Sequence, residues 1–279
     1  MSDFVFLNGQ IIKHENAKIF VDDRGFHFGD GLYDVMLFCN NKIIDFDAHF
    51  KRMEKTAKRL YIYLDCKKDE IFAIIHKLSQ KNNIKNGRIV IVITRGSSDR
   101  WHKDLSSIRQ NIFIQIQKYE IDFSLLIEKI SIKTEKDIRW AMRDIKTTNL
   151  LPAVIIREKI KKNGFDDAIF FDSKTKIIHE ASRANVFIVK KNEIITPPLS
   201  KDILSGITRA RIIKLLKKNK RLKIIEKDFK IKDLHNADEI FLTASTARIV
   251  NVKNIDGIKK NQSKISEEIL KIYHEFLRN

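Results

Sequence analysis

DIKTTNLL, residues 144–151, places one lysine, Lys146, between two segments of different periodicity. The segment before it, Ile132 to Arg139, has the pattern of a strand. The segment after it begins at Leu150 and repeats apolar residues at helical spacing, which predicts a helix. Lys146 therefore lies at a connection between regular elements, where functional side chains are often held on a rigid scaffold. Taken alone, a lysine at such a connection is more often an ordinary solvated charge.

The helix after Lys146 begins with residues suited to a helix start. Pro152 is tolerated in the first turn, because the N–H that proline lacks would have no partner within the helix. The side chain of Thr148 or Asn149 can accept a hydrogen bond from the first turn and cap it. We expect this helix to run from Leu150 to Lys162.

The first part of the chain predicts strands joined by tight turns and covered by helices. Asn8-Gly9 between two apolar segments is a strong hairpin signal. A second helix is expected over Glu70 to Gln80. The helix before it opens at Asp47 and carries an apolar stripe, formed by Phe50, Met53, Ala57, Leu60 and Tyr61. The expected strands are Phe4–Leu7, Ile11–Lys13, Leu32–Cys39, Ile43–Ile44, Arg88–Thr94 and Asn111–Gln117.

The periodicity is lost around Tyr119 to Leu126, and we place a domain boundary there. The prediction is a small N-terminal α+β domain, residues 1–120, and a larger C-terminal α+β domain, residues 121–279, which carries Lys146. A site is expected where the two domains meet. In the second domain strands and helices mix without regular βαβ alternation. The expected strands are Ala168–Phe171, Asn185–Val189 and Glu239–Leu242, and the expected helices are Ile207–Lys218 and Ser266–Leu277.

Bulk composition indicates a soluble globular protein. A chain of 279 residues with 43% apolar residues can fill two cores. Its longest apolar runs, such as Ile89 to Ile93, are far shorter than the roughly 20 residues of a membrane span. The N-terminus lacks the basic start and apolar core of a signal peptide. Cys39 and Cys66 suggest neither a disulfide framework nor a metal cluster, so we expect a cytoplasmic protein without a metal.

The net charge of +18 raises the question of a polyanion partner. A nucleic-acid binder would gather its basic residues with aromatic residues or glycines on one face. Here the lysines are spread along the chain, with short clusters at Lys159–Lys162 and Lys214–Arg221. This pattern favours a lysine-rich surface without a specific nucleic-acid site. A basic polyanion-binding protein, whose binding would depend steeply on salt, stays a remote alternative.

The segment around Lys146 resembles the lysine motif of the fold-type IV pyridoxal-phosphate aminotransferases, the family of D-amino acid, branched-chain and aminodeoxychorismate enzymes. Three further segments match that family in the same order, and the resemblance runs from about Phe6 to about Val252. They are Asp23–Tyr33, His179–Phe187 and Leu204–Arg209. The resemblance implies a two-domain α+β fold, a homodimer and a pyridoxal 5′-phosphate cofactor.

The resemblance assigns two residues to catalysis. Lys146 matches the lysine that forms a Schiff base with the cofactor and moves a proton between the substrate and the cofactor. Such an amine must lose its own proton, which a partly desolvated site favours. Glu180 matches the glutamate that keeps the cofactor ring nitrogen protonated, so that the ring can accept electrons. Taken alone, Glu180 is more often an exposed acid at a strand end.

The cofactor phosphate is expected at the start of a helix. Gly206-Ile207-Thr208 precedes a helical segment, where free backbone N–H groups and the helix dipole favour an anion. Without the family match, this would be an ordinary helix cap. The resemblance implies a set of cofactor-binding residues beyond Lys146 and Glu180: Arg52, Leu204, Ile207, Thr208 and Ser245.

Substrate recognition is where the branches of the family differ. Arg100-Trp101-His102 resembles the arginine-x-histidine pair of the D-amino acid aminotransferases. In that group the pair, with a tyrosine matching Tyr33, holds the substrate carboxylate, and its loop reaches the site of the partner subunit. A planar guanidinium suits a carboxylate because it can bond both oxygens. Trp101 and Arg183 stand where these enzymes have small residues, which affects the expected side-chain preference.

The function implied by the resemblance is transamination between a D-amino acid and a 2-oxo acid by a ping-pong mechanism. D-alanine and 2-oxoglutarate are the expected pair. The alternatives within the family are a branched-chain amino acid aminotransferase, which would not need the Arg100/His102 pair, and an aminodeoxychorismate lyase, which would release pyruvate.

Overall fold

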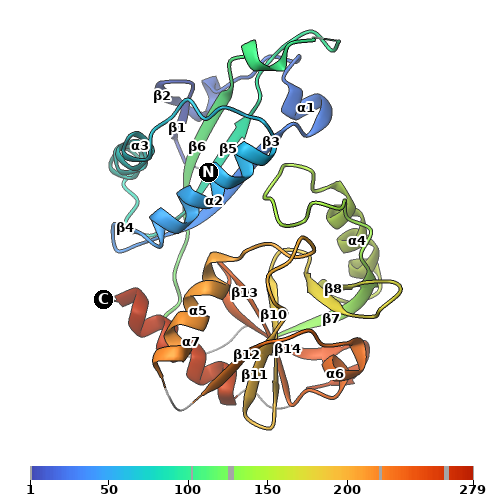
Figure 1. Ribbon diagram of the computed structural model, residues 1–279. Coiled ribbons are helices and arrows are strands. Elements are labelled where there is room, and N and C mark those ends of the chain that lie inside the picture. Colours follow the sequence, from blue (N-terminus) through green and yellow to red (C-terminus); the bar gives the residue numbers. More distant parts are fainter. Residues whose placement is uncertain (1, 102, 125–128, 220–221, 261–263, 279) are drawn as a thin grey trace. The chain divides into compact units, whose positions relative to one another are not determined.

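The computed structural model describes residues 2–101, 103–124, 129–219, 222–260 and 264–278. The chain forms two compact units (Figure 1). The N-terminal unit comprises Met1–Asp122 and Ile145–Asn149, and the C-terminal unit comprises Phe123–Asp144 and Leu150–Asn279. The segment that holds Lys146 thus packs with the N-terminal unit, whereas the sequence analysis assigned it to the C-terminal domain. Part of the expected boundary, residues 125–126, lies outside the described residues.

The N-terminal unit is built on a six-stranded sheet in the order β2-β1-β6-β5-β3-β4, in which all neighbours are antiparallel. The strands are β1 (Phe4–Leu7), β2 (Gln10–Lys13), β3 (Gly31–Cys39), β4 (Lys42–Ile43), β5 (Gly87–Thr94) and β6 (Asn111–Lys118). The helices are η1 (His14–Asn16), α1 (Arg24–Phe28), α2 (Phe46–Arg59), α3 (Lys68–Lys81) and η2 (Leu105–Ser107).

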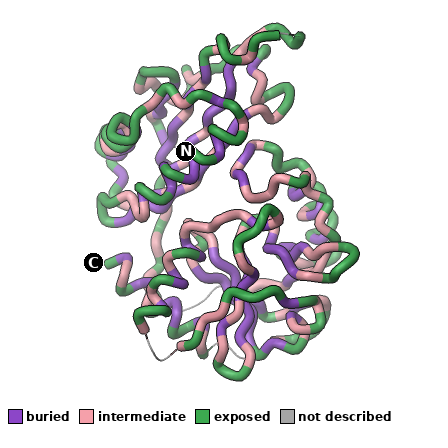
Figure 2. The backbone as a smooth tube through the Cα atoms, in the orientation of Figure 1, coloured by how far each residue is buried: buried purple, intermediate pink, exposed green. Residues whose placement is uncertain are grey.

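Alternating side chains explain how this sheet forms a core with α2 and α3. In β5 the isoleucines Ile89, Ile91 and Ile93 are buried, because successive residues of a strand point to opposite faces. The buried stripe of α2 shares one core cluster with them. Figure 2 colours the buried segments of the backbone purple. The expected stripe was wrong at its last residue. The helix ends at Arg59, and Tyr61 has positive φ and is exposed.

The C-terminal unit contains a nine-stranded sheet in the order β12-β11-β10-β13-β14-β7-β8-β9, with β15 paired to β14. It is mixed, since β7 runs parallel to both β8 and β14. The strands are β7 (Lys129–Lys136), β8 (Asp167–Phe171), β9 (Ile178–Ala181), β10 (Asn185–Lys190), β11 (Glu193–Thr196), β12 (Lys223–Glu226), β13 (Glu239–Ala244), β14 (Arg248–Ile255) and β15 (Ile258–Lys259). The helices are α4 (Leu151–Lys162), α5 (Ile207–Lys218), α6 (Ile231–His235) and α7 (Lys264–Arg278). Among the described residues, no helix combines the length and apolar character needed to cross a membrane.

The strand before the lysine segment ends earlier than its sequence pattern predicts. We expected Ile132–Arg139, but β7 ends at Lys136, where it pairs with Phe171, the last residue of β8. The backbone N–H of Asp137 still donates to the carbonyl oxygen of Phe171, at 3.0 Å, and the ladder ends there. The Asp137 carboxylate instead accepts a hydrogen bond from the backbone N–H of Arg139, at 3.1 Å. In this turn the side chains of Asp137 and Arg139 bond to each other, and Arg139 also bonds to Glu180.

The expected cap of α4 was also wrong. The N-cap residue is Leu150, and no side-chain hydrogen bond caps the helix. Thr148 Oγ1 and Asn149 Nδ2 instead donate to the carbonyl oxygen of Gly29, at 2.8 and 3.1 Å. The two polar side chains therefore fix the lysine segment to the start of β3.

Candidate active site

The lysine segment occupies an otherwise open edge of β3. The neighbour of β3 on this side, β4, pairs only with Phe38 and Cys39. Further along the same strand, Leu32 forms an antiparallel bridge with Thr147. Tyr33 N–H donates to the carbonyl of Lys146, at 3.2 Å. Because backbone bonds hold the segment on a core strand, the Cα of Lys146 has a fixed position.

The amine of Lys146 lies against Tyr33. Lys146 Nζ donates to Tyr33 Oη at 3.2 Å and lies 4.3 Å from the centre of the tyrosine ring. The lysine is half-buried. The structure therefore brings together two residues that the sequence analysis selected separately, the proposed Schiff-base lysine and the proposed substrate-binding tyrosine.

Arg52 is placed by a buried carboxylate. Its Nε and Nη2 donate to the two oxygens of Asp34, at 2.9 and 2.7 Å, and His49 Nδ1 lies 2.8 Å from the same carboxylate. Asp34 is fully buried. Burial alone would raise its pKa, but the charges and hydrogen bonds of Arg52 and His49 hold the pKa well below its usual range. The planar fork of Arg52 is thus fixed on one side by Asp34.

We expect Asp34→Asn to lower the free energy of unfolding by about 3–5 kcal/mol at neutral pH, because it removes the buried carboxylate charge that pairs with Arg52. Since the folded-state pKa of Asp34 is depressed, its contribution exists above the ordinary value near 3.8 and is lost as pH falls below it. Thermal unfolding of the native enzyme and of Asp34→Asn should therefore show a difference in the free energy of unfolding that narrows below about pH 4. Asp47→Asn, which removes an exposed pair with Lys68, is the control and should cost less than about 1 kcal/mol. An equal loss in the two variants would contradict the assignment.

Glu180 lies in β9 with both carboxylate oxygens bonded. Oε1 accepts from Arg139 Nη1 at 2.6 Å. Oε2 accepts from Asn185 Nδ2 at 3.1 Å and from the backbone N–H of Leu204 at 3.0 Å. The residue is 4% exposed. Burial raises the pKa of Glu180 above its ordinary value, although the charge of Arg139 and the Leu204 N–H act against this. It is not the exposed strand-end acid of the alternative interpretation.

Arg139 and Asp137 are parts of this site that the sequence analysis missed. Arg139 Nε and Nη2 donate to the Asp137 carboxylate at 3.0 and 2.9 Å, while its third nitrogen holds Glu180. The Arg139 guanidinium packs 4.6 Å from the centre of the Phe170 ring. The one available signal was the place of both residues just before the lysine segment, and we had assigned them to a strand.

The start of α5 is open to an anion. Its N-cap residue is Gly206, and no side-chain hydrogen bond caps the helix. A Cβ at Gly206 would overlap with Asn185 Oδ1, so a larger residue would displace the asparagine that holds Glu180. Ile207 and Thr208 form the first turn, and Thr208 is buried. Uncapped N–H groups at a helix N-terminus suit a phosphate.

A buried hydroxyl in the C-terminal unit also fits a bound cofactor. Thr243 lies opposite Asn185 in the β10–β13 ladder, and directly opposed residues share a face of the sheet. Thr243 Oγ1 is buried, and no described residue bonds to it. Ser245 follows two residues later, in the turn between β13 and β14. The carboxylate, the open helix start and this hydroxyl are the donor and acceptor types that the ring nitrogen and phosphate of pyridoxal phosphate require.

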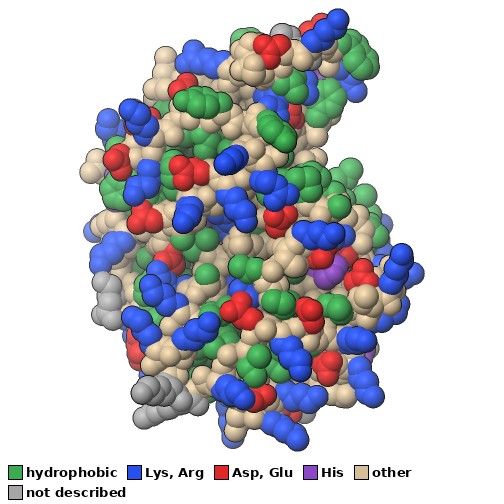
Figure 3. Space-filling model, in the orientation of Figure 1, with side chains coloured by type: hydrophobic (Ala, Val, Ile, Leu, Met, Phe, Trp, Pro, Cys, Tyr) green, Lys and Arg blue, Asp and Glu red, His purple; other side chains and the backbone are tan. Residues whose placement is uncertain are grey.

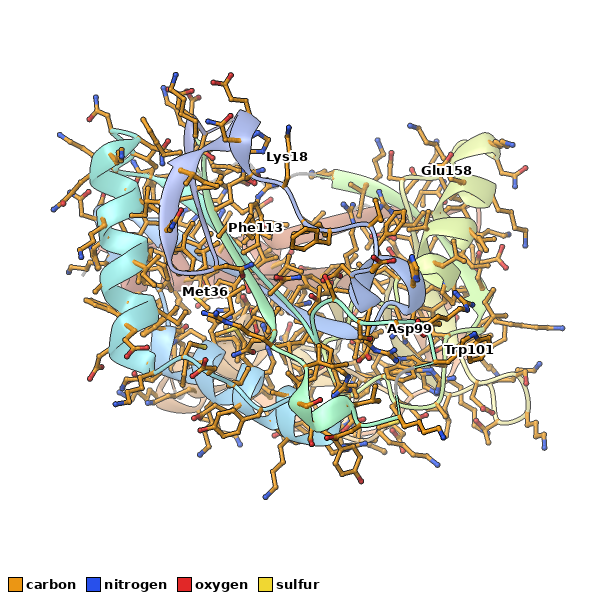
Figure 4. All side chains as sticks on the ribbon, turned by 90° about the horizontal axis from the view of Figure 1, so that it is seen from above. Lys18, Met36, Asp99, Trp101, Phe113 and Glu158 are labelled. Carbon is orange, nitrogen blue, oxygen red and sulfur yellow. The ribbon has the colours of Figure 1, made fainter. Side chains whose placement is uncertain are left out.

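The proposed carboxylate-binding loop follows β5. The Arg100 guanidinium stacks on Phe28, 4.8 Å from the ring centre, and not on Tyr33. Trp101 is 81% exposed, and its backbone N–H donates to Asp99 Oδ1 at 2.8 Å; both residues are labelled in Figure 4. His102 lies outside the described residues. In the C-terminal unit Arg183 is largely exposed, with its Nε 4.0 Å from Asp167.

On the face that Figure 3 shows, basic side chains do not gather into one patch. Figure 3 shows lysines and arginines scattered among acidic side chains on the visible face of each unit. Many of the basic residues are held in ion pairs, such as Lys159 with Glu135 and Lys223 with Glu193. On this face the distribution agrees with a lysine-rich surface and gives no support to a nucleic-acid site.

Comparison with known proteins places the chain in a family. The model of the class IV aminotransferases matches residues 31–255. The chain is 32% identical to a D-alanine aminotransferase of Staphylococcus epidermidis over 254 residues, which covers 91% of this chain and 89% of that protein. It is similar in fold to the branched-chain amino acid aminotransferase of Escherichia coli, with a TM-score of 0.91, 21% identity and coverage of 99% and 95%. A putative 4-amino-4-deoxychorismate lyase of Legionella pneumophila matches with a TM-score of 0.83, 26% identity and coverage of 94% and 96%.

The chain belongs to the class IV aminotransferases, the fold-type IV enzymes that depend on pyridoxal phosphate. The predicted α+β fold, the aminotransferase activity and the cofactor are thereby confirmed. When bound, this cofactor supplies an aldehyde that can take up an amine and a ring that can accept an electron pair.

Proposed function

We propose that this enzyme transfers an amino group between a D-amino acid and a 2-oxo acid, with D-alanine and 2-oxoglutarate as the main pair. The observation that carries the proposal is the 32% identity to a D-alanine aminotransferase over 91% of the chain. The similarity to the branched-chain enzyme, at 21% identity, concerns the fold alone. The Arg100-Trp101-His102 sequence adds to the case, because a cation on this loop suits a substrate carboxylate.

In this proposal, residues of the chain divide the work. Lys146 binds the cofactor and, as a free amine, carries the proton that leaves the substrate α-carbon. Glu180, as a carboxylate, holds the proton on the cofactor ring nitrogen. The start of α5 at Ile207 and Thr208 holds the cofactor phosphate together with Arg52 and Ser245, and Leu204 lies in the segment before this helix. The 3.2 Å contact of Lys146 with Tyr33 supports a common location for proton transfer and substrate binding.

The remaining part of the proposal concerns assembly and location. We propose a homodimer in which the loop with Arg100 and His102 enters the partner's site. In the N-terminal unit large apolar side chains are unusually exposed near α1, as expected of an interface: Ile19, Phe20, Val21 and Phe26. We also propose that the enzyme is cytoplasmic, which agrees with the absence of a disulfide between Cys39 and Cys66.

The experiment that tests the proposed reaction offers the purified holoenzyme three alternatives. These are D-alanine with 2-oxoglutarate, L-leucine with 2-oxoglutarate, and aminodeoxychorismate alone. We expect the first to yield pyruvate and glutamate, with the glutamate in the D form by chiral chromatography. Conversion of L-leucine but not D-alanine would replace the proposal by a branched-chain aminotransferase. Release of pyruvate from aminodeoxychorismate without an oxo acid would replace it by a lyase.

We expect Arg100→Ala to raise the KM for D-alanine with a smaller effect on kcat, because it removes a charged partner of the substrate carboxylate. Loss of such a partner costs about 2–5 kcal/mol where the site is desolvated. Arg109→Ala is the matched control, since Arg109 is an exposed arginine of the same loop. Steady-state kinetics of both variants distinguish a specific role from a general loss of surface charge. An unchanged KM in Arg100→Ala would show that this arginine does not bind the carboxylate.

A further inference from the structure

The guanidinium of Arg139 is held in one orientation. Two of its nitrogens donate to the two oxygens of Asp137, at 3.0 and 2.9 Å, and the third donates to Glu180 at 2.6 Å. A planar fork bound at both oxygens of one carboxylate cannot rotate without breaking two charge-assisted hydrogen bonds. The Phe170 ring, 4.6 Å away, covers the guanidinium face. The contact between Arg139 and Glu180 therefore depends on Asp137.

Asp137 is itself fixed from several sides. Its side chain is 1% exposed, and Oδ2 lies 2.8 Å from His179 Nδ1 and 3.1 Å from Arg143 Nε. Burial would raise the pKa of Asp137, but hydrogen bonds from His179 and Arg139 hold the pKa well below its usual range. The carboxylate is therefore anionic, and His179 Nδ1 must carry the proton that is shared with it. His179 and Glu180 are consecutive residues of β9, so one strand contacts both ends of the Asp137–Arg139 pair.

Ion pairs extend the cluster beyond Glu180. The Arg139 guanidinium pairs with Asp137 and Glu180, and the Arg143 guanidinium pairs with Asp137 and Asp202. The Asp202 side chain is 31% exposed, so this end of the cluster reaches the surface, whereas Asp137 and Glu180 lie at its buried end.

We propose that Asp137 and His179 are positioning residues that keep Glu180 ionised for the cofactor ring nitrogen by fixing Arg139 against it. The inference rests on the proposed role of Glu180. Glu180 is 4% exposed, and its burial favours the neutral acid. Arg139 is the cation that opposes this, and without Asp137 its guanidinium can turn away. An anionic Glu180 stabilises the positive charge of a protonated ring nitrogen. A neutral Glu180 carries no charge that could do so.

The test uses the apo protein, so that neither activity nor cofactor binding enters the result. Protein labelled with 13C at the glutamate carboxyl carbon is titrated by NMR, and the Glu180 signal is identified as the one missing from Glu180→Gln. The negative charge of Asp137 itself raises the pKa of Glu180, so its direct loss would lower the Glu180 midpoint. In Asp137→Asn we nevertheless expect the midpoint to rise, because a released Arg139 no longer stabilises the Glu180 carboxylate, and an opposite charge within about 4–6 Å is worth about one pH unit or more. His179→Phe should shift it in the same direction by a smaller amount.

Asp256→Asn is the matched control. Asp256 lies in the same unit and is also held by a histidine, since its Oδ2 lies 2.8 Å from His235 Nε2. It bonds Thr134 and Lys133 instead of the partners of Glu180. An unchanged or lower midpoint in Asp137→Asn, or an equal shift in Asp256→Asn, would overturn the proposal. If Asp137→Asn does not fold, the His179→Phe variant serves as the test, because it leaves Asp137 in place. An unchanged Glu180 midpoint in His179→Phe would also overturn the proposal. Failure of the proposed reaction would instead appear in the substrate assays.

Discussion

Replacing Lys146 with alanine should give a folded protein that neither holds its cofactor covalently nor turns over substrate. The backbone contacts that fix residue 146, from Tyr33 N–H and from Thr147 to Leu32, do not involve the lysine side chain. Its amine donates a side-chain hydrogen bond to Tyr33 Oη. The fold should therefore persist, while kcat falls by at least the roughly 10²–10⁴-fold that positioned proton transfer contributes.

The measurement is borohydride reduction of the holoenzyme followed by intact-mass analysis and peptide mapping. The native enzyme should carry the cofactor mass on the peptide containing residue 146, and the variant should carry none. Lys159→Ala is the control, because Lys159 is an exposed lysine of α4 paired with Glu135. A label on any other peptide, or a variant that keeps its turnover, would refute the role of Lys146.

Replacing Glu180 with glutamine is expected to lower kcat by about 10²–10³-fold, the usual cost of losing one preorganised electrostatic partner. The amide has nearly the same shape, but it cannot hold a proton on a ring nitrogen. In either orientation of the amide, its N–H₂ group faces a donor, Arg139 at one position or Asn185 and Leu204 at the other. The cofactor should still attach to Lys146, because the amine is untouched, so the variant should be coloured but slow.

Glu239→Gln provides a strict comparison. Glu239 is 2% exposed and accepts from the backbone N–H groups of Ile265 and Ser266 at the start of α7. Its amide variant should lose stability in thermal unfolding but retain kcat. Equal losses of kcat in both variants would mean that a general disturbance of the C-terminal unit, and not the ring-nitrogen role, explains the result.

Local patterns predicted the elements whose neighbours are near in the chain. The alternation of Ile89, Ile91 and Ile93 located a half-buried strand, and the stripe of α2 was correct through Ala57. The residues at which helices and strands end were less predictable, because these ends depend on partners that are distant in the sequence. The strand β7 stops at Lys136 since β8 stops at Phe171, and no residue near Lys136 indicates this.

The candidate site shows the same division. Motifs selected Lys146, Tyr33, Glu180 and Thr208 one at a time, but their neighbours depend on the fold. Arg139 reaches Glu180 across 41 positions in the chain, and Arg52 reaches Asp34 across 18. Thr148 and Asn149 have the composition of a helix cap, yet the carbonyl of Gly29, about 120 positions away, offers them a partner. Sequence spacing contains no information on such contacts.

The membership of Ile145–Asn149 in the N-terminal unit constrains how this enzyme can be divided. A gene fragment ending at Asp122 would encode the first sheet with the free edge of β3 exposed and without its lysine. The complementary fragment would carry that lysine on a segment lacking the strand it pairs with. Exchange of whole domains between relatives, or insertion of a cleavable linker after Asp122, should therefore separate the reactive amine from its support. A chimaera that retains residues 145–149 from the same parent as residues 1–122 avoids this mismatch.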